Sequence, residues 1–167
     1  MSQEPVEIIV EIPKGSRNKY EIDHETGAIW LDRHLFTASQ YPADYGFVAN
    51  TLGEDGDPLD ALVLLDEPTF PGCHVWGRPI GVFWMRDEAG PDAKVLFVPH
   101  KDPRWEYLQD LDDVPGHLLA EITHFFEIYK ALEPNKSTEV RNWEPRERAE
   151  AEIAAAFARA VDHGAGH

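Results

Sequence analysis

The residues with the clearest chemical potential are three aspartates in one short run, Asp55-Gly56-Asp57-Pro58-Leu59-Asp60. Gly56 and Pro58 disfavour a helix, so the run is predicted to form a loop or a kinked strand end. Carboxylates packed this closely repel one another at neutral pH unless a cation lies among them. Hard divalent ions such as Mg2+ prefer carboxylate oxygens. The run therefore indicates a metal site and, through the metal, phosphate or carbonyl chemistry.

Three other interpretations of this run compete with a magnesium site. An EF-hand calcium loop requires Gly at its sixth position and Glu at its twelfth, where this chain has Asp60 and Asp66. An aspartyl-phosphate nucleophile would follow a buried apolar strand, and residues 50–54 do not form one. A solvated acidic turn stays open, because Asp-Gly pairs are common in turns. Taken alone, the run does not decide between that turn and the metal site.

A second acidic pair, Asp87 and Asp92, is expected on a hairpin loop after a strand that ends at Met85. Lys94 lies two residues beyond Asp92 and shares its strand face. Acids in a loop at a strand end are commonly solvated turn residues. The pair gains weight because it matches the first run, and together the two groups indicate one site.

Several basic and phenolic residues are compatible with a site but do not identify one singly. They are Lys19, Arg33, Tyr41, Tyr45, Tyr129 and Lys130. The tyrosines also fit core aromatics with a hydroxyl at the rim, and Lys130 fits the favourable end of a helix dipole. Lys19 and Glu21 share one strand face and could form a surface ion pair worth little.

Eight histidines raise the question of a zinc site. They are dispersed along the chain, with no His-Glu-x-x-His motif and no cysteine pair. We therefore interpret them as isolated surface or core side chains.

Composition favours an ordinary globular protein with one domain, residues 1–167, whose core spans about 6–160. The net charge of -16 argues against nucleic acid and against an anionic membrane surface as partners, because both reward Lys and Arg. A single cysteine, Cys73, excludes an internal disulfide framework, and no apolar stretch approaches a membrane span. A cytoplasmic location is the simplest expectation.

Hydrophobic periodicity predicts strands in the first two thirds of the chain. The expected strands cover residues 6–12, 19–23, 28–33, 62–65, 76–85 and 94–99. After residue 112 the period becomes helical, with a helix beginning at Val114-Pro115 and ending before Pro134. A second helix is predicted from near Pro145 to about Val161, with the apolar stripe Ala149, Ile153, Phe157 and Ala160. Strands first and helices last predict an α+β fold, a small barrel with helices packed outside it.

The motifs, taken in order, resemble those of the soluble family I inorganic pyrophosphatases. The run at 55–60 fits that family's Asp-x-Asp-Pro-x-Asp signature. The other matching segments are Glu11-Ile12-Pro13, Asn18-Lys19-Tyr20-Glu21, Leu31-Asp32-Arg33, residues 41–47, residues 77–81, residues 87–90, Asp92-Ala93-Lys94 and residues 124–130. The resemblance covers roughly residues 6–160, nearly the whole chain.

This resemblance implies a five-stranded barrel of the OB type with flanking C-terminal helices. It implies hydrolysis of inorganic pyrophosphate to two phosphates by several Mg2+ ions, with metal-activated water and an aspartate as general base; Mn2+ and Zn2+ are possible substitutes. The bacterial type implies a homohexamer built from two trimers. Neither nucleic acid nor a membrane is an expected partner.

The resemblance also assigns roles to individual residues. Metal ligands would be Glu11, Glu21, Asp55, Asp60, Asp87 and Asp92, with Asp60 bridging two ions and the two glutamates acting partly through water. Asp57 would accept the proton of the attacking water, with Asp92 as the alternative. Phosphoryl groups would be bound by Lys19, Arg33, Tyr45, Tyr129 and Lys130, with Lys94 near the acids and Tyr41 shaping the pocket.

Two rival functions stay open on the sequence. OB-type barrels commonly bind oligonucleotides, although the charge and the lack of a basic aromatic groove argue against it here. A metal phosphohydrolase for nucleotides or polyphosphate is the second rival.

Overall fold

The computed structural model of the protein describes residues 4–87, 90–134 and 138–163. The strands are β1 (Val6–Ile12), β2 (Asn18–Ile22), β3 (Ile29–His34), β4 (Asp44–Val48), β5 (Asp60–Val63), β6 (His74–Asp87), β7 (Gly90–Pro99) and β8 (Thr138–Pro145). The helices are α1 (Gly116–Ile128) and α2 (Arg146–Asp162), preceded by short 3-10 turns at Pro103–Trp105 and Leu111–Asp113. No helix within these ranges is long and apolar enough to cross a membrane.

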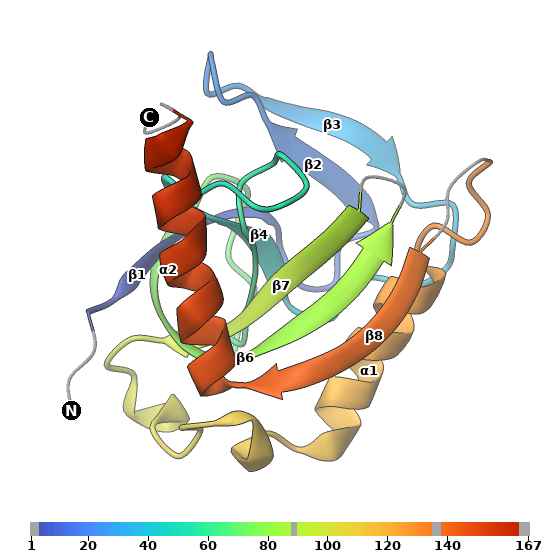
Figure 1. The fold of residues 1–167 in the computed structure, drawn as a ribbon. Helices are drawn as coiled ribbons and strands as arrows, with labels where there is room; N and C mark the ends of the chain where they lie inside the picture. Colours follow the sequence, from blue (N-terminus) through green and yellow to red (C-terminus); the bar gives the residue numbers. More distant parts are fainter. Residues whose placement is uncertain (1–3, 88–89, 135–137, 164–167) are drawn as a thin grey trace.

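Five strands close into a ring (Figure 1). Its order is β1-β4-β5-β7-β6, and β6 pairs back with β1. The pairing of β5 with β7 is parallel, and the other pairs in the ring are antiparallel. The α+β barrel predicted from the sequence is therefore confirmed.

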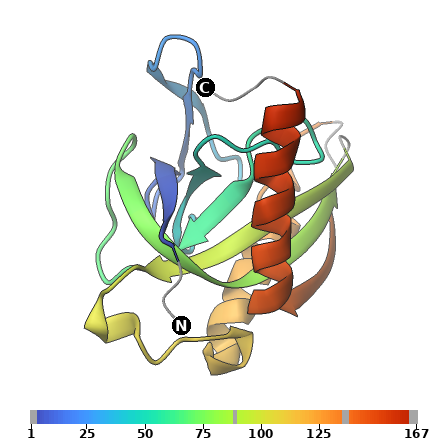
Figure 2. The same ribbon diagram turned by 60° about the vertical axis from the view of Figure 1, so that its left-hand side comes forward.

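Three strands lie outside that ring, and one of them, β8, was not predicted from the sequence. β2 and β3 form a separate hairpin sheet that stands out from the barrel (Figure 2). β8 pairs with the outer edge of β6 and lies between the two helices in the chain. The expectation that all strands precede the helices was therefore wrong. β4 was also missed, because its five residues include Asp44, Tyr45 and Gly46 and show no apolar alternation.

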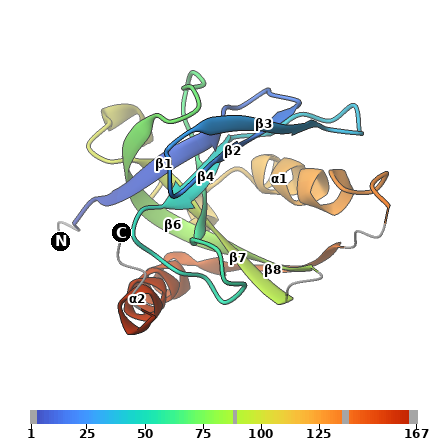
Figure 3. The same cartoon turned by 90° about the horizontal axis from the view of Figure 1, so that it is seen from above.

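The two helices cover opposite faces of the sheet formed by β6, β7 and β8 (Figure 3). Alternate residues of β5 and β7 point to the two sides: Leu62 and Leu96 join the cluster that contains α1, and Val63 and Val95 join the cluster that contains α2. β7 is consequently buried on both faces, which explains its long apolar run.

The apolar stripe of α2 differs in one position from the prediction. Ala149, Ile153 and Ala160 are buried as expected, and Ala156 joins them. Phe157 is 39% exposed, because it lies at the margin of this stripe. Its predicted place in the core was wrong.

A glycine allows β1 and β4 to approach closely beside the candidate site. A Cβ atom at Gly46 would lie 1.9 Å from the carbonyl oxygen of Ile9, a distance that no side chain permits. The neighbouring Tyr45 is thereby held on the wall of the barrel, where its hydroxyl reaches the lysine of β7.

Candidate active site

A cavity of about 260 Å3 opens beside the end of the barrel at which β5 begins. Its wall brings together acidic, basic and aromatic side chains from the barrel, from the β2–β3 hairpin and from the segment after α1. The charged residues on the wall are Glu11, Glu21, Asp55, Asp57, Asp60, Asp92, Lys19, Arg33, Lys94 and Lys130. Nearly every residue that the sequence singled out therefore meets in one place.

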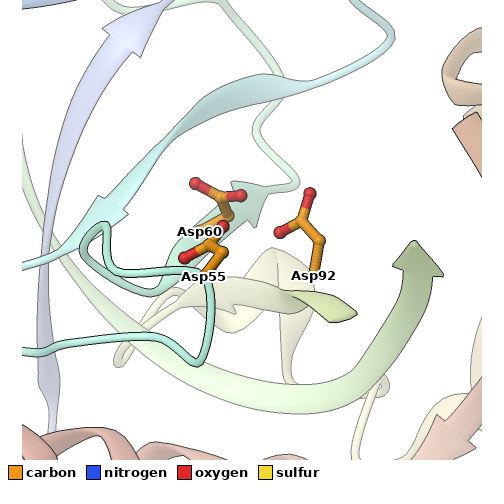
Figure 4. A group of neighbouring side chains, drawn as sticks. All are labelled: Asp55, Asp60 and Asp92. Atoms are coloured by element: carbon orange, nitrogen blue, oxygen red, sulfur yellow. The ribbon is translucent and has the colours of Figure 1, made fainter. Parts of the chain in front are cut away.

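One side of the cavity, which we term the acidic wall, consists of Asp55, Asp57, Asp60 and Asp92. Asp60 is the first residue of β5, Asp92 is the third residue of β7, and Asp55 lies in the loop before β5. One carboxylate oxygen from each of these three aspartates lies within 4.8 Å of the others (Figure 4). Asp92 was expected in a loop; it lies in a strand instead and is 8% exposed.

The loop of the acidic wall is a tight turn. The Gly53 amide donates to the Asp57 carbonyl at 2.6 Å, and the Asp57 amide donates to Oδ1 of Asp55 at 3.1 Å. Gly56 has a φ of +92°, in the left-handed region that favours glycine. This turn folds the run back on itself, so Asp55 and Asp60 face the same space although five positions separate them.

Lys94 is the cation inside the acidic wall. It pairs in register with Asp60 across the parallel β5–β7 ladder. Its Nζ lies 3.1 Å from Asp60, 3.0 Å from Asp92 and 2.7 Å from the Tyr45 hydroxyl, and the residue is 1% exposed. An ammonium has three donors, so these three contacts can use all of them. Burial lowers the Lys94 pKa, but the two carboxylates outweigh it and hold that pKa well above its ordinary value.

Two carboxylates of the acidic wall, those of Asp55 and Asp60, have raised pKa values and resist ionisation. Burial raises the pKa of Asp55 to about 6, and the neighbouring Asp92 and Asp57 add to the shift. Burial and the charge of Asp92 likewise hold the Asp60 pKa well above its ordinary value. One lysine offsets only part of this negative charge. The donor set of converging carboxylate oxygens therefore fits a hard divalent cation such as Mg2+.

The opposite side of the cavity, which we term the basic wall, consists of Lys19, Arg33 and Lys130. Lys19 and Arg33 are cross-strand partners on β2 and β3, and Lys130 follows α1. The Lys19 Nζ lies 3.1 Å from Oδ2 of Asp32, so Lys19 pairs with Asp32 rather than with Glu21. Arg33 contacts the same Asp32 oxygen at 2.5 Å.

The three tyrosines take different positions. Tyr45 and Tyr129 line the cavity, whereas Tyr41 lies behind them in the core. The Tyr41 ring is 5.5 Å from the Tyr45 ring and 4.6 Å from the Phe125 ring. Burial raises the pKa of Tyr41 and of Tyr45, so both stay protonated and Tyr45 keeps a hydroxyl for hydrogen bonding. Tyr41 can shape the pocket only by supporting the side chains in front of it.

Comparison with known proteins identifies this arrangement. Residues 8–161 match the profile of the family described as inorganic pyrophosphatase. The chain is a member of the inorganic pyrophosphatase family. The resemblance inferred from the motifs is thereby confirmed, and the matched range includes every residue of the two walls.

Individual pyrophosphatases are similar over almost their full length. The inorganic pyrophosphatase of Streptomyces coelicolor is 62% identical over 161 residues, which are 96% of this chain and 98% of that protein. That of Methanosarcina acetivorans is 54% identical over 86% of each chain. The crystal structure of the inorganic pyrophosphatase from Thermus thermophilus superimposes with a TM-score of 0.92 at 49% identity, covering 96% of this chain and 93% of the other.

Three further residues assigned from the pyrophosphatase resemblance lie at different depths. Glu11 and Glu21 both line the cavity. Oε2 of Glu11 accepts a 2.9 Å hydrogen bond from the Ile22 amide, which ties β1 to the hairpin, and burial raises the Glu11 pKa. Asp87 was expected in a loop, but it is the last residue of β6 and pairs with Gly90 of β7. Its side chain lies outside the described part of the chain.

Sequence reasoning missed His24, which lines the same cavity. Its ring meets the Phe47 ring edge-on, with the centroids 5.1 Å apart. The interpretation of all histidines as isolated therefore failed for this one. Its place two residues after β2 was the available signal, since the same hairpin carries Lys19 and Glu21.

Proposed function

We propose that this protein hydrolyses inorganic pyrophosphate to two orthophosphates. The observation that carries the proposal is the facing of the acidic and basic walls across one cavity. Such an arrangement suits a substrate that is an anion and reaches the acids only together with cations. Membership of the pyrophosphatase family and the names of its relatives, which are inorganic pyrophosphatases, support the same conclusion.

The acidic wall would hold the metal ions. Asp55, Asp60 and Asp92 provide converging oxygens, with Glu11, Glu21 and Asp87 as further ligands in the proposal. Mg2+ is the proposed ion, with Mn2+ or Zn2+ as substitutes. When bound, these ions would neutralise charge on the diphosphate and lower the pKa of the attacking water.

The basic wall would bind the two phosphoryl groups. Arg33 offers a planar fork of donors, whereas Lys19 and Lys130 act as point charges. The hydroxyls of Tyr45 and Tyr129 lie on the wall and can donate to substrate oxygens. Lys94 is retained as a substrate contact in the proposal, although its three donors are within reach of protein partners.

Asp57 is the preferred proton acceptor, and Asp92 is the alternative. Asp57 lies at the exposed margin of the cavity, and no hydrogen bond to its carboxylate is found among the described residues. Asp92 lies 3.0 Å from the Lys94 ammonium, which lowers its basicity. A carboxylate that is not engaged by a cation is the better base.

The decisive experiment measures phosphate release from pyrophosphate with and without Mg2+. We expect activity with the metal and none with excess EDTA. Hydrolysis that persists in EDTA would exclude the metal mechanism. Parallel assays with ATP and tripolyphosphate separate this proposal from a broader phosphohydrolase, and a faster reaction with either would favour that rival.

Three broader features remain part of the proposal. The chain is proposed to act as a single domain in a homohexamer in the cytoplasm. Exposed apolar side chains, including Trp30, Phe70 and Trp76, are available for contacts between subunits, and the one free cysteine suits a reducing compartment. Sedimentation of the purified protein measures the mass of the assembly, and a monomer would contradict the hexamer.

A further inference from the structure

Arg33 is held by two carboxylates that do not line the cavity. Its Nη1 donates to Asp32 at 2.5 Å, and its Nη2 donates to Glu133 at 3.1 Å. Its Nε is buried and has no hydrogen-bond partner among the residues that the structure describes. A guanidinium can satisfy Nε and one Nη together on a single carboxylate. Here two separate carboxylates hold its far end instead, and a buried donor is left unpaired.

An unpaired buried donor is costly, so the position of this guanidinium needs a reason. This position does not give Arg33 its largest number of hydrogen bonds, because Nε is left without a partner in the described part of the chain. Glu133 and Asp32 together fix the side chain where it reaches the wall of the cavity. We therefore infer that the two carboxylates serve to place the guanidinium at the cavity, at the expense of one hydrogen bond.

Glu133 is unusual for an acidic residue in this protein. Its side chain is 6% exposed, in contrast to the 23% of Arg33, and it belongs to neither wall of the cavity. Its amide donates to the Lys130 carbonyl at 3.0 Å, so it closes the turn that carries Tyr129 and Lys130. The ion pair with Arg33 therefore fastens this turn to the β2–β3 hairpin.

We propose that Glu133 is a positioning residue for substrate binding: it fixes Arg33 and, through the turn, the spacing between Arg33 and Lys130. The inference rests on the proposed function, since it assigns the role through the phosphoryl groups that the basic wall would bind. Asp32 shares the task, but it also contacts Lys19 and therefore cannot be tested for Arg33 alone. Among the ion pairs of the described residues, Glu133 contacts one residue of the basic wall, Arg33.

The test substitutes Glu133→Gln, which keeps the shape and removes the charge. We expect KM for magnesium pyrophosphate to rise roughly tenfold, the usual range for losing a charged hydrogen bond, with kcat changed less than threefold. Calorimetry with Mg2+ and methylenediphosphonate should show a matching loss of affinity. Glu121→Gln is the control, because Glu121 forms an exposed ion pair with His117 on α1, away from the cavity.

A double-mutant cycle distinguishes positioning from a purely structural role. In an Arg33→Ala background, Glu133→Gln should change KM less than twofold, because the group that it positions is gone. The same tenfold rise in that background, or an unchanged KM in the single variant, would overturn the inference. Melting temperatures measured in parallel show whether any loss is one of folding.

Two outcomes are kept apart. If the unmodified protein releases no phosphate, the proposed function fails; the inference is then judged by methylenediphosphonate affinity alone, and an unchanged affinity in Glu133→Gln overturns it. If the unmodified protein is active and Glu133→Gln matches it, only the inference fails. If Glu133→Gln does not fold, Glu133→Asp replaces it. This variant keeps the charge but moves the carboxylate away from Arg33 by the length of one methylene. An unchanged KM in Glu133→Asp would also overturn the inference.

Discussion

The acidic and basic walls of the cavity are built in opposite ways. The acidic wall stands on strands of the closed ring and on the tight loop before β5, and the buried Lys94 forms ion pairs with two of its carboxylates. The basic wall stands on the separate β2–β3 hairpin and on the turn after α1. Two of its cations, Lys19 and Arg33, already face carboxylates outside the cavity.

This difference shows where function costs stability. In the acidic wall, burial of Asp55 and Asp60 beside Asp92 makes their ionisation unfavourable, so the protein without metal carries an unfavourable interaction there. In the basic wall, Lys19 and Arg33 are paired with carboxylates before any substrate arrives. The first wall is therefore expected to depend on a bound ion, and the second on the geometry of its supporting carboxylates.

The largest effect should come from Asp57, the one member of the acidic wall outside the close cluster of three. Asp57→Asn should lower kcat by roughly 10^2-fold to 10^4-fold, the range for loss of a general base. Mg2+ affinity measured by calorimetry should stay within about twofold, because the three converging carboxylates are intact.

Asp66→Asn is the matched control for that variant, since Asp66 pairs with Arg104 at an exposed position outside the cavity. A kcat near that of the unmodified protein in Asp57→Asn would transfer the role of base to Asp92. Asp57 would then no longer differ from the other aspartates of the acidic wall by acting as the proton acceptor.

A lysine taken from each wall tests the contrast directly. In EDTA at pH 7, Lys94→Met should lower the free energy of unfolding by about 3–5 kcal/mol, because buried carboxylates lose their counter-ion. Lys19→Met should cost less than about 1 kcal/mol, because its ion pair is partly exposed. Urea denaturation measures both. Equal losses would show that the two walls are electrostatically alike.

The pH dependence of the metal-free protein should be a smaller effect than the loss in Lys94→Met. The pKa of Asp55 is raised from 3.8 to about 6, so the folded form binds this proton more tightly than the unfolded chain. Stability from this group is therefore highest below pH 3.8 and is lost as pH rises to about 6. A shift of that size corresponds to about 3 kcal/mol when fully buried, and because Asp55 is only half-buried, screening by solvent should reduce the loss to about 2 kcal/mol.

Comparison of the unmodified protein with Asp55→Asn isolates this contribution, since the other titrating groups are shared. Denaturation curves recorded in EDTA give the free energy of unfolding at each pH. Between pH 4 and 7 this free energy should fall less steeply in Asp55→Asn than in the unmodified protein. Saturating Mg2+ should weaken the dependence in the unmodified protein. An identical pH slope for both proteins in EDTA would contradict the raised pKa.

Much of the acidic wall was accessible from sequence because its members are close in the chain. The spacing of Asp55, Asp57 and Asp60 indicated a metal site without deciding it, and the second acidic pair and Lys94 added weight even though Asp92 was assigned to a loop. A small barrel was likewise predictable, since four of the ring strands show clear apolar patterns, whereas the number of five strands came from the family resemblance. β4 escaped because its sequence is dominated by a buried aspartate and a glycine required for close packing.

The basic wall was recovered only through family motifs, because its parts are assembled by tertiary structure. Nothing near Arg33 in the chain indicates Glu133 as its partner, and the one signal for His24 was its place on the hairpin that carries Lys19 and Glu21. Tyr41 was assigned to the pocket, but it lies in the core behind the pocket. A motif indicates which residues lie near a site, but it does not show whether a side chain reaches the cavity surface. Phe157 was misplaced for a related reason: a helical stripe predicts which residues share a face, not where that face ends.

The contact between Arg33 and Glu133 joins residues that are 100 positions apart. During ribosomal synthesis, residues are delivered in chain order, so all five strands of the ring and the whole acidic wall are made before this glutamate. The last contact of the site thus comes from the final third of the chain. An unfinished chain possesses the acids that hold cations but lacks the turn that completes the substrate side.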